Sequence, residues 1–234
     1  MREKHIVIHS QALDFWLARG AVLAIVCLQL LVINDLSFGP RWLAPALELA
    51  LLVPLSVATA WTQAQVRDAT ADHEWNAIAR YRVLIRRTAL LLTGIVSVMN
   101  CGALVGLVQA LLHGHASNGT TLLVDALNIW VTNIIVFALW FWSTDRGGPP
   151  TCGLVKRAQA DFLFPQMTFT QREAGTWLPG FVDYLYLAFT NATAFSPTDT
   201  LPLTRSAKLL MMVESMISLL TVALVAARAV NILA

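Results

Sequence analysis

The stretch that decides the fold runs from Phe181 to Asn231 and reads FVDYLYLAFTNATAFSPTDTLPLTRSAKLLMMVESMISLLTVALVAARAVN. Its first part, Phe181 to Phe195, is apolar, and a helix of that length spans about 22 Å, less than the ~30 Å hydrocarbon core of a bilayer. Four polar residues interrupt it: Asp183, Thr190, Asn191 and Thr193. The next corner, SPTDTLPLT, contains prolines and side chains that hydrogen-bond their own backbone, so it cannot continue a helix. Because Leu209 to Ala234 is long enough to cross, the pattern predicts a half-helix, a polar turn and a full helix, the order of elements in a re-entrant hairpin.

Several residues of this stretch match positions in a known pore architecture. They are Tyr186, Thr190 and Thr193 in the half-helix, Asp199, Pro202 and Thr204 after it, and the words MVES and AARAVNI in the last helix. The stretch resembles the pore hairpin of tetrameric potassium-channel-like proteins, in which a pore helix leads through Thr-Val-Gly-Tyr-Gly-Asp and Pro-x-Thr to the inner helix. The whole chain also resembles a family of small bacterial integral membrane proteins, on the words FWSTDRGGP, DFLFPQM and VDYLYLAFTNATAFSPTDT. The resemblance implies an oligomeric, tetrameric cation pore in the bacterial inner membrane.

The potassium filter itself is missing. The aligned stretch is Ala194-Phe195-Ser196-Pro197-Thr198, and it lacks the glycines whose backbone freedom aims filter carbonyls at an ion. We therefore expect no potassium selectivity.

Two interpretations of the corner remain open. If four copies surround an axis, Thr193, Ser196 and Thr198 would form hydroxyl rings and Asp199 a carboxylate ring that favours cations. Alternatively, the corner is only a capped turn, with Asp199 or Thr204 as a helix cap.

The composition identifies the class of protein. The 234 residues are 57% hydrophobic and only 13% charged, whereas soluble domains carry about 25% charged residues. This indicates an integral membrane protein, and the net charge of +2 gives no reason to expect a nucleic-acid partner. The three cysteines are far apart in the sequence, and we expect neither a disulfide framework nor a metal site from them.

The predicted fold is an all-α polytopic helical bundle with four spans followed by the channel-like hairpin. Residues 1–145 form the four-span scaffold with an N-terminal interfacial segment, 146–180 a cytoplasmic connection, and 181–234 the hairpin. The predicted spans are Ala18–Ile33, Trp42–Trp61, Thr88–Leu112 and Leu122–Phe141, with a polar loop or helix at Gln63–Arg87. The amphipathic DFLFPQM of the connection is expected to pack against a neighbouring subunit rather than lie on the membrane.

Loop charges predict the orientation. Arginine and lysine gather in the N-terminus, the loop before the third span and the 143–180 connection, so the positive-inside rule places these, and the N-terminus, in the cytoplasm. The hairpin would then enter from the cytoplasm, inverted relative to potassium channels, or Phe181–Phe195 would cross as a short, tilted fifth span of six. The six-span arrangement, which we favour from sequence, leaves Arg205 and Lys208 outside.

Charged residues inside apolar runs are the other candidates for function, because a charge at mid-bilayer costs several kcal/mol unless it is paired or hydrated. Glu48, Glu214 and Arg228 fall in this class, with Asp125 near the start of the fourth span. They either line a cation or proton path or are satisfied by a neighbouring helix. Asn100, Asn128 and Asn133 are expected to bond across helices.

Three functions stay open: an oligomeric cation pore, a small secondary transporter that uses Glu48 and Glu214 at mid-membrane, and a non-conducting scaffold. Because the sequence has no catalytic constellation, we do not expect an enzyme. No cofactor is expected, and the expected partners are the lipid bilayer, inorganic cations and further copies of the chain.

Overall fold

The computed structural model describes residues 2–31, 46, 49–50, 72–112, 119–148, 160–168, 177–194 and 199–233. Five α-helices make up most of these residues: α1 (Arg2–Leu31), α3 (Asp72–Leu112), α4 (Gly119–Thr144), α6 (Phe181–Ala194) and α7 (Arg205–Leu233). The only strands among them are the two-residue pair β1 (Phe162–Leu163) and β2 (Leu201–Pro202). The helical fold class is therefore confirmed.

Four of these helices are long and apolar enough to cross a membrane. Their apolar windows are Leu13–Leu30, Val83–Leu112, Thr121–Thr144 and Arg205–Ala227. They agree with the first, third and fourth predicted spans and with the predicted final helix, so the prediction of a polytopic membrane protein is confirmed. The predicted span Trp42–Trp61 lies outside the described residues.

Two helices begin earlier than the apolar pattern indicates. α1 is continuous from Arg2, so the N-terminal segment that we expected to be an interfacial helix leads without a break into the apolar window that begins at Leu13. α3 begins at Asp72, and part of the polar stretch before Arg87 thus extends the third span as one helix. Helical backbone continues past the apolar window because nothing in the sequence at these junctions breaks it, neither proline nor a turn signal.

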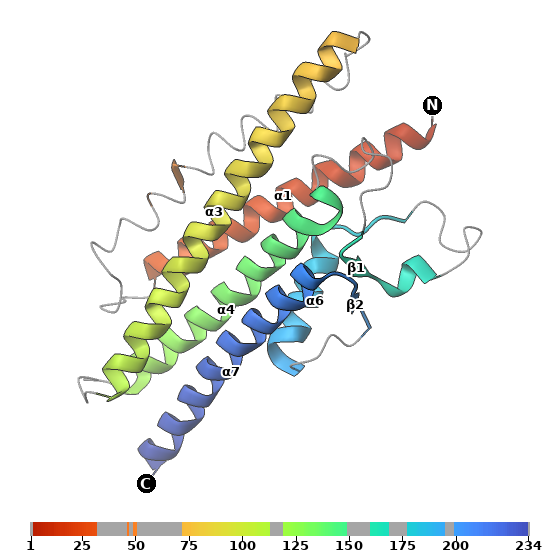
Figure 1. Ribbon diagram of the computed structural model, residues 1–234. Helices are drawn as coiled ribbons and strands as arrows, with labels where there is room; N and C mark the ends of the chain where they lie inside the picture. The colour runs from red at the N-terminus through yellow and green to blue at the C-terminus, as the bar shows by residue number, and fades with distance from the viewer. Residues whose placement is uncertain are drawn as a thin grey trace.

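α4 is the centre of the bundle (Figure 1). Its side chains face α1, α3, α6 and α7, and Ala126, Ile129, Val136, Ala138 and Phe141 are buried. Because neighbours cover it on several sides, α4 is far more enclosed than the other candidate spans. A helix that is apolar around its whole circumference is suited to this position.

One end of the bundle gathers the end of α4 and the starts of α6 and α7. Here Asp14, about midway along α1, accepts a hydrogen bond from Phe181 N at the start of α6, at 3.1 Å. Arg86 of α3 donates to Ser143 O at the end of α4, at 3.4 Å, and α7 also begins here. At the opposite end, Leu107 of α3, Leu122 of α4 and Leu224 of α7 come together.

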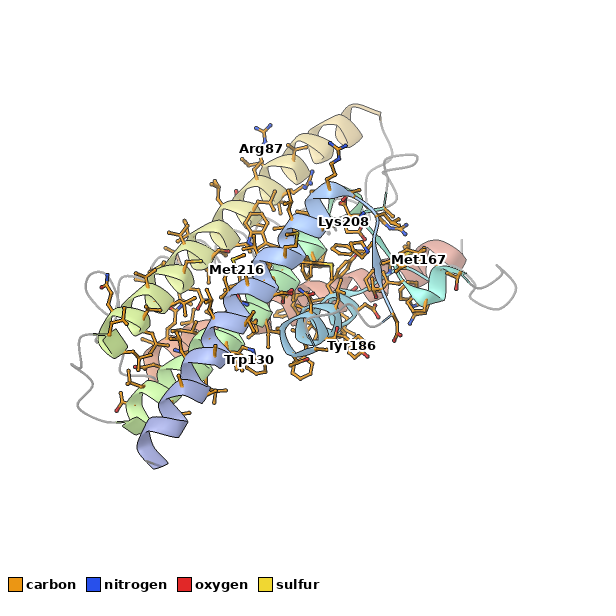
Figure 2. The ribbon with its side chains drawn as sticks, turned by 60° about the horizontal axis from the view of Figure 1, so that its bottom comes forward. Arg87, Trp130, Met167, Tyr186, Lys208 and Met216 are labelled. Atoms are coloured by element: carbon orange, nitrogen blue, oxygen red, sulfur yellow. The ribbon has the colours of Figure 1, made fainter. Side chains whose placement is uncertain are left out.

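The described basic side chains concentrate at the first of these ends, which we call the basic end. They are Arg86, Arg87, Arg146, Arg205 and Lys208, and the one other described basic side chain is Arg19 of α1. Figure 2 shows Arg87 and Lys208 toward this end of the bundle, whereas Trp130 of α4 lies farther from it. α1, α3 and α7 run away from the basic end, and α4 runs toward it.

α6 leaves the basic end and the chain returns to it. The helix has 14 residues, about 21 Å of rise, and it starts beside Trp142 and Asp145 of α4. By Leu201 the chain is paired with Leu163, again beside the end of α4. The favoured alternative of a fifth crossing is therefore wrong for the described residues, since α6 and α7 begin at the same end.

Candidate functional site

The tip of α6 carries the hydroxyls predicted for a pore. Thr190 and Thr193 lie in the last turns of the helix, and each hydroxyl donates to a carbonyl one turn earlier, Tyr186 O at 2.9 Å and Phe189 O at 2.8 Å. Thr193 and Ala194 are exposed on the single chain. The tip is therefore polar and uncovered, although its hydroxyls are already bonded within the helix.

The remaining residues of the predicted filter are only partly placed. Phe195, Ser196, Pro197 and Thr198 lie outside the described residues. Asp199 is described and exposed, two residues before β2 at the basic end. The capped-turn interpretation is confirmed in one detail, because Thr204 Oγ1 accepts from Ala207 N at 3.3 Å at the start of α7.

Below this tip, a polar seam joins three helices in the apolar interior. Glu214 of α7 is 0% exposed, and its Oε2 accepts from Asn191 Nδ2 of α6 at 2.7 Å. The same amide also donates to Met211 O at 2.9 Å. From α4, Asn133 Nδ2 donates to Glu214 O at 3.2 Å and to Ser218 Oγ at 3.0 Å. We call Asn133, Asn191, Glu214 and Ser218 the buried seam.

The buried seam lies near the middle of the apolar window Arg205–Ala227 of α7. Glu214 is about 14 Å along α7 from Arg205, roughly half of the ~30 Å hydrocarbon core. Its second carboxyl oxygen, Oε1, is buried and has no hydrogen-bond partner among the described residues. A buried polar atom of this kind normally has a partner, so its lack of one is a reason to look for a function.

A second buried carboxyl fixes the basic end. Asp145 follows the last residue of α4 and is 3% exposed. Tyr184 OH donates to its Oδ2 at 2.5 Å, Asp161 N donates to its Oδ1 at 2.7 Å, and Arg146 Nε lies 3.8 Å from Oδ2. Burial raises the pKa of Asp145, although Tyr184, Asp161 N and Arg146 each act in the opposite direction.

Asp161 links this carboxyl to the start of α7. Its Oδ1 accepts from Thr204 Oγ1 at 2.5 Å, and its backbone O accepts from Leu203 N at 2.8 Å. We call Asp145, Asp161, Tyr184 and Thr204 the anchor. It ties α4, β1, α6 and β2 together at one point, which holds both ends of the hairpin.

The DFLFPQM segment belongs to the anchor. Phe162 is fully buried against Phe141, with ring centroids 5.2 Å apart, and Phe164 packs on Tyr184 at 5.3 Å and on Trp177 at 5.9 Å. The expectation that this segment contacts a neighbouring subunit is therefore wrong for these two rings, which fill a space within their own chain.

A close approach fixes the start of α6. Asp183 Oδ2 accepts from Gly180 N at 2.8 Å, and Asp14 Oδ1 accepts from Phe181 N at 3.1 Å. A Cβ on Gly180 would lie 2.8 Å from Asp14 Oδ1, so the Asp14 carboxylate would have to shift to admit it. Asp14, Asp145, Asp183 and Tyr184 share a cavity of about 360 Å³ with Trp142 and Trp177.

Other candidates are placed less completely. Glu48 lies outside the described residues, and Arg228 belongs to α7 although its side chain is not described. The role predicted for Asn100 is confirmed, since it donates to Ile129 O of α4 at 3.3 Å; Asn133 also bonds across helices. Asn128 instead contacts Thr132 of its own helix. Among the described residues, no group of three or more His, Cys, Asp and Glu side chains could hold a metal ion.

Several site residues were not singled out from the sequence. Asn191 interrupts the apolar run of α6, but the residue alone does not identify Glu214 as its partner, because they are 23 positions apart on different helices. Asp145, Asp161 and Tyr184 lie in three separate polar or aromatic segments of the sequence. They come into contact only because the folded chain brings these segments to the same end of the bundle. The sequence therefore contained a signal for Asn191 and for Thr204 of the anchor, but none for Asp145, Asp161 and Tyr184.

Comparisons with protein-family models, with curated proteins and with solved structures found no match for this chain.

Proposed function

We propose that the chain forms an oligomeric, cation-conducting pore in which α6 and α7 surround the axis. The observation that carries the proposal is the course of α6, which starts at the basic end, ends near mid-bilayer depth, and is followed by a chain that is back at the basic end by Leu201. Non-helical backbone at membrane depth is tolerated only where protein covers it or where it lines a water-filled space.

The surface of α6 supports this role. Its buried face holds Phe181, Tyr184, Leu187, Ala188, Asn191 and Ala192. The opposite face, with Val182, Tyr186, Phe189 and Thr193, is exposed on the single chain. The negative end of the α6 dipole points toward the centre of the bilayer, where it would stabilise a cation, and Asp199 would add a carboxylate near the mouth.

Charge distribution supports an inverted hairpin. With the basic end in the cytoplasm, as the positive-inside rule requires, the N-terminus is cytoplasmic and Arg205 and Lys208 are on the favoured side. This removes the conflict of the six-span arrangement. The pore loop would then enter from the cytoplasmic face of a bacterial plasma membrane.

The test is cation flux into liposomes that contain the purified full-length protein. D199N should lower the flux of monovalent cations roughly tenfold, equivalent to ~1.4 kcal/mol, because it removes the carboxylate ring at the mouth. A Thr193→Val variant should also lower the flux. The matched control is Thr88→Val, since Thr88 is a partly exposed threonine on α3 whose hydroxyl donates to Leu84 O in the same way.

A crosslink makes the test independent of conduction. Thr198→Cys, in a background in which Cys27, Cys101 and Cys152 are serine, should give crosslinked oligomers up to the tetramer if the hairpin is at the axis. A monomer without crosslinks, or flux that D199N and the threonine variants leave unchanged, would overturn the proposal.

A second candidate function is a small secondary transporter. The observation that favours it is the unpartnered Oε1 of Glu214 at mid-depth, beside the end of a discontinuous helix. A monomer or dimer in which E214Q abolishes transport while D199N does not would favour this function.

A further inference from the structure

We propose that Glu214 is a reversible proton-binding site, and that the proton reaches it through the tip of α6. The proposal concerns the buried seam rather than the hairpin axis, and it is independent of the conduction proposed above. The ligand is a proton, which converts a carboxylate to a carboxylic acid on the Glu214 side chain.

The geometry of the carboxyl favours a ligand that binds to one oxygen. Oε2 has a donor, the Asn191 amide at 2.7 Å, while Oε1 is buried without a partner among the described residues. A fully satisfied structural carboxylate would accept several hydrogen bonds, as a carboxylate has about four acceptor positions. The free oxygen is the position at which a proton can add without displacing any existing bond.

The chemistry of the neighbours favours a proton over a metal cation. Among the described residues the carboxyl has one partner, the Asn191 N–H of α6. The other polar groups of the seam are bonded elsewhere: Asn133 Nδ2 donates to the backbone O of Glu214 and to Ser218 Oγ, and Ser215 Oγ donates to Asn191 O. Alkali and alkaline-earth cations need several oxygen ligands directed at one point. A proton needs one oxygen.

No charge among the described residues neutralises Glu214. On the three helices around it, the titratable and charged groups are Asp125 on α4, Asp183, Tyr184 and Tyr186 on α6, and Arg205, Lys208 and Arg228 on α7, with Asp145 directly after α4. None of those whose side chains are described bonds the carboxyl. An unpaired charge at this depth costs several kcal/mol. When Glu214 gains or loses a proton, the free energy of the buried seam therefore changes, because no neighbouring charge compensates.

The seam connects the proton to the hairpin. Asn191 lies in the last turns of α6, next to the exposed tip at Thr193 and Ala194, and it bonds Glu214 and Met211 of α7 at once. Water that reaches the tip is thus separated from Glu214 by the Asn191 turn. A change in the charge of Glu214 acts on the bond that holds α6 against α7.

The experiment is an infrared titration of the full-length protein in nanodiscs. A protonated-carboxyl band that converts reversibly to a carboxylate band as the pH rises is expected in the wild type, and E214Q should lose it. E48Q and D199N are the controls and should keep the band. E214D keeps a carboxyl at this position and should show a titrating band at a shifted frequency. It allows the proposal to be tested even if E214Q does not fold.

Each outcome decides the proposal. A band that is absent, that does not change with pH, or that E214Q retains while it folds would overturn it. Loss of the band in E214Q together with loss of pH-dependent proton uptake into liposomes supports it. Because D199N leaves the band in place, failure of the pore and failure of the proton site give different results.

Discussion

Two buried carboxyls in this molecule have opposite surroundings. Asp145, at the end of α4, has partners on both oxygens from Tyr184 and the Asp161 amide, and Arg146 lies beside it. Glu214, in the middle of α7, has the Asn191 amide on one oxygen and nothing on the other. Both side chains are almost fully buried, so the difference is in how they are satisfied.

The different numbers of hydrogen-bond partners suggest a structural role for Asp145 and a ligand-binding role for Glu214. A carboxyl whose partners come from three segments of the chain fixes those segments, because removal leaves several buried polar groups without partners. A carboxyl with an empty oxygen contributes less to the fold and stays available for a ligand. We therefore assign the anchor to stability and the buried seam to the proposed proton site.

The largest predicted effect follows from this comparison. D145A should lower the free energy of unfolding by about 3 kcal/mol, because the Tyr184 hydroxyl and the Asp161 amide lose their acceptor in a buried place. E214Q, which keeps an oxygen for Asn191, should cost about 1 kcal/mol or less. Thermal unfolding of both variants in the same nanodiscs measures the difference.

Tyr184→Phe tests the same assignment from the other side. It removes one of the hydrogen bonds to Asp145, and its loss of unfolding free energy should lie between the losses for D145A and E214Q. Equal losses for D145A and E214Q would contradict the division between anchor and seam.

A smaller effect is expected at the start of α6. G180A should destabilise by about 1 kcal/mol, because the added Cβ would lie 2.8 Å from Asp14 Oδ1 and displace the carboxylate that accepts from Phe181 N. G20A is the matched control in α1, where a Cβ meets nothing within 4 Å, and it should be neutral or slightly stabilising. The unfolding midpoints of the two alanine variants provide the comparison. Equal midpoints would show that α1 is not held close to α6.

The sequence was sufficient for the elements that depend on local pattern. Apolar runs of helical length predicted the described spans, and the prolines with the hydroxyl-rich corner predicted a break between a helix that ends near Phe195 and one that runs from Leu209. In the structure α6 ends at Ala194 and α7 begins at Arg205. The short length of α6 was also predicted from the sequence. Each of these follows from residues that are neighbours in the chain.

What the sequence could not supply depends on contacts between distant residues. The direction of return after α6 is set by β1 pairing with β2 and by Asp161 bonding Thr204, which lie 43 positions apart. Loop charge alone left Arg205 and Lys208 on the side opposite the other basic residues, because the count assumed that Phe181–Phe195 crosses. Glu214 was recognised as an intramembrane acid, but its partner Asn191 required the helices to be placed.

The smallest effect is a pH dependence that belongs to Asp145. Burial raises the pKa of this carboxyl above its ordinary value of 3.8, so the folded state binds the proton more tightly than the unfolded state. The contribution to stability is therefore complete below about pH 3.8 and is lost as the pH rises through the raised pKa. Its size is ~1.4 kcal/mol for each unit between the two pKa values.

D145N isolates this contribution, because asparagine does not titrate. The stability of the wild type relative to D145N should decrease as the pH rises from about 4 and should then level off once Asp145 is ionised in both states. Unfolding midpoints of the two proteins across this range measure it. If the advantage of the wild type grew with pH instead, the bonds from Tyr184 and Asp161 N would outweigh burial and favour the carboxylate. Asp145 would then be a carboxylate in the folded protein. The charge state of the two carboxyls would no longer separate the anchor from the buried seam, and only their hydrogen-bond partners would.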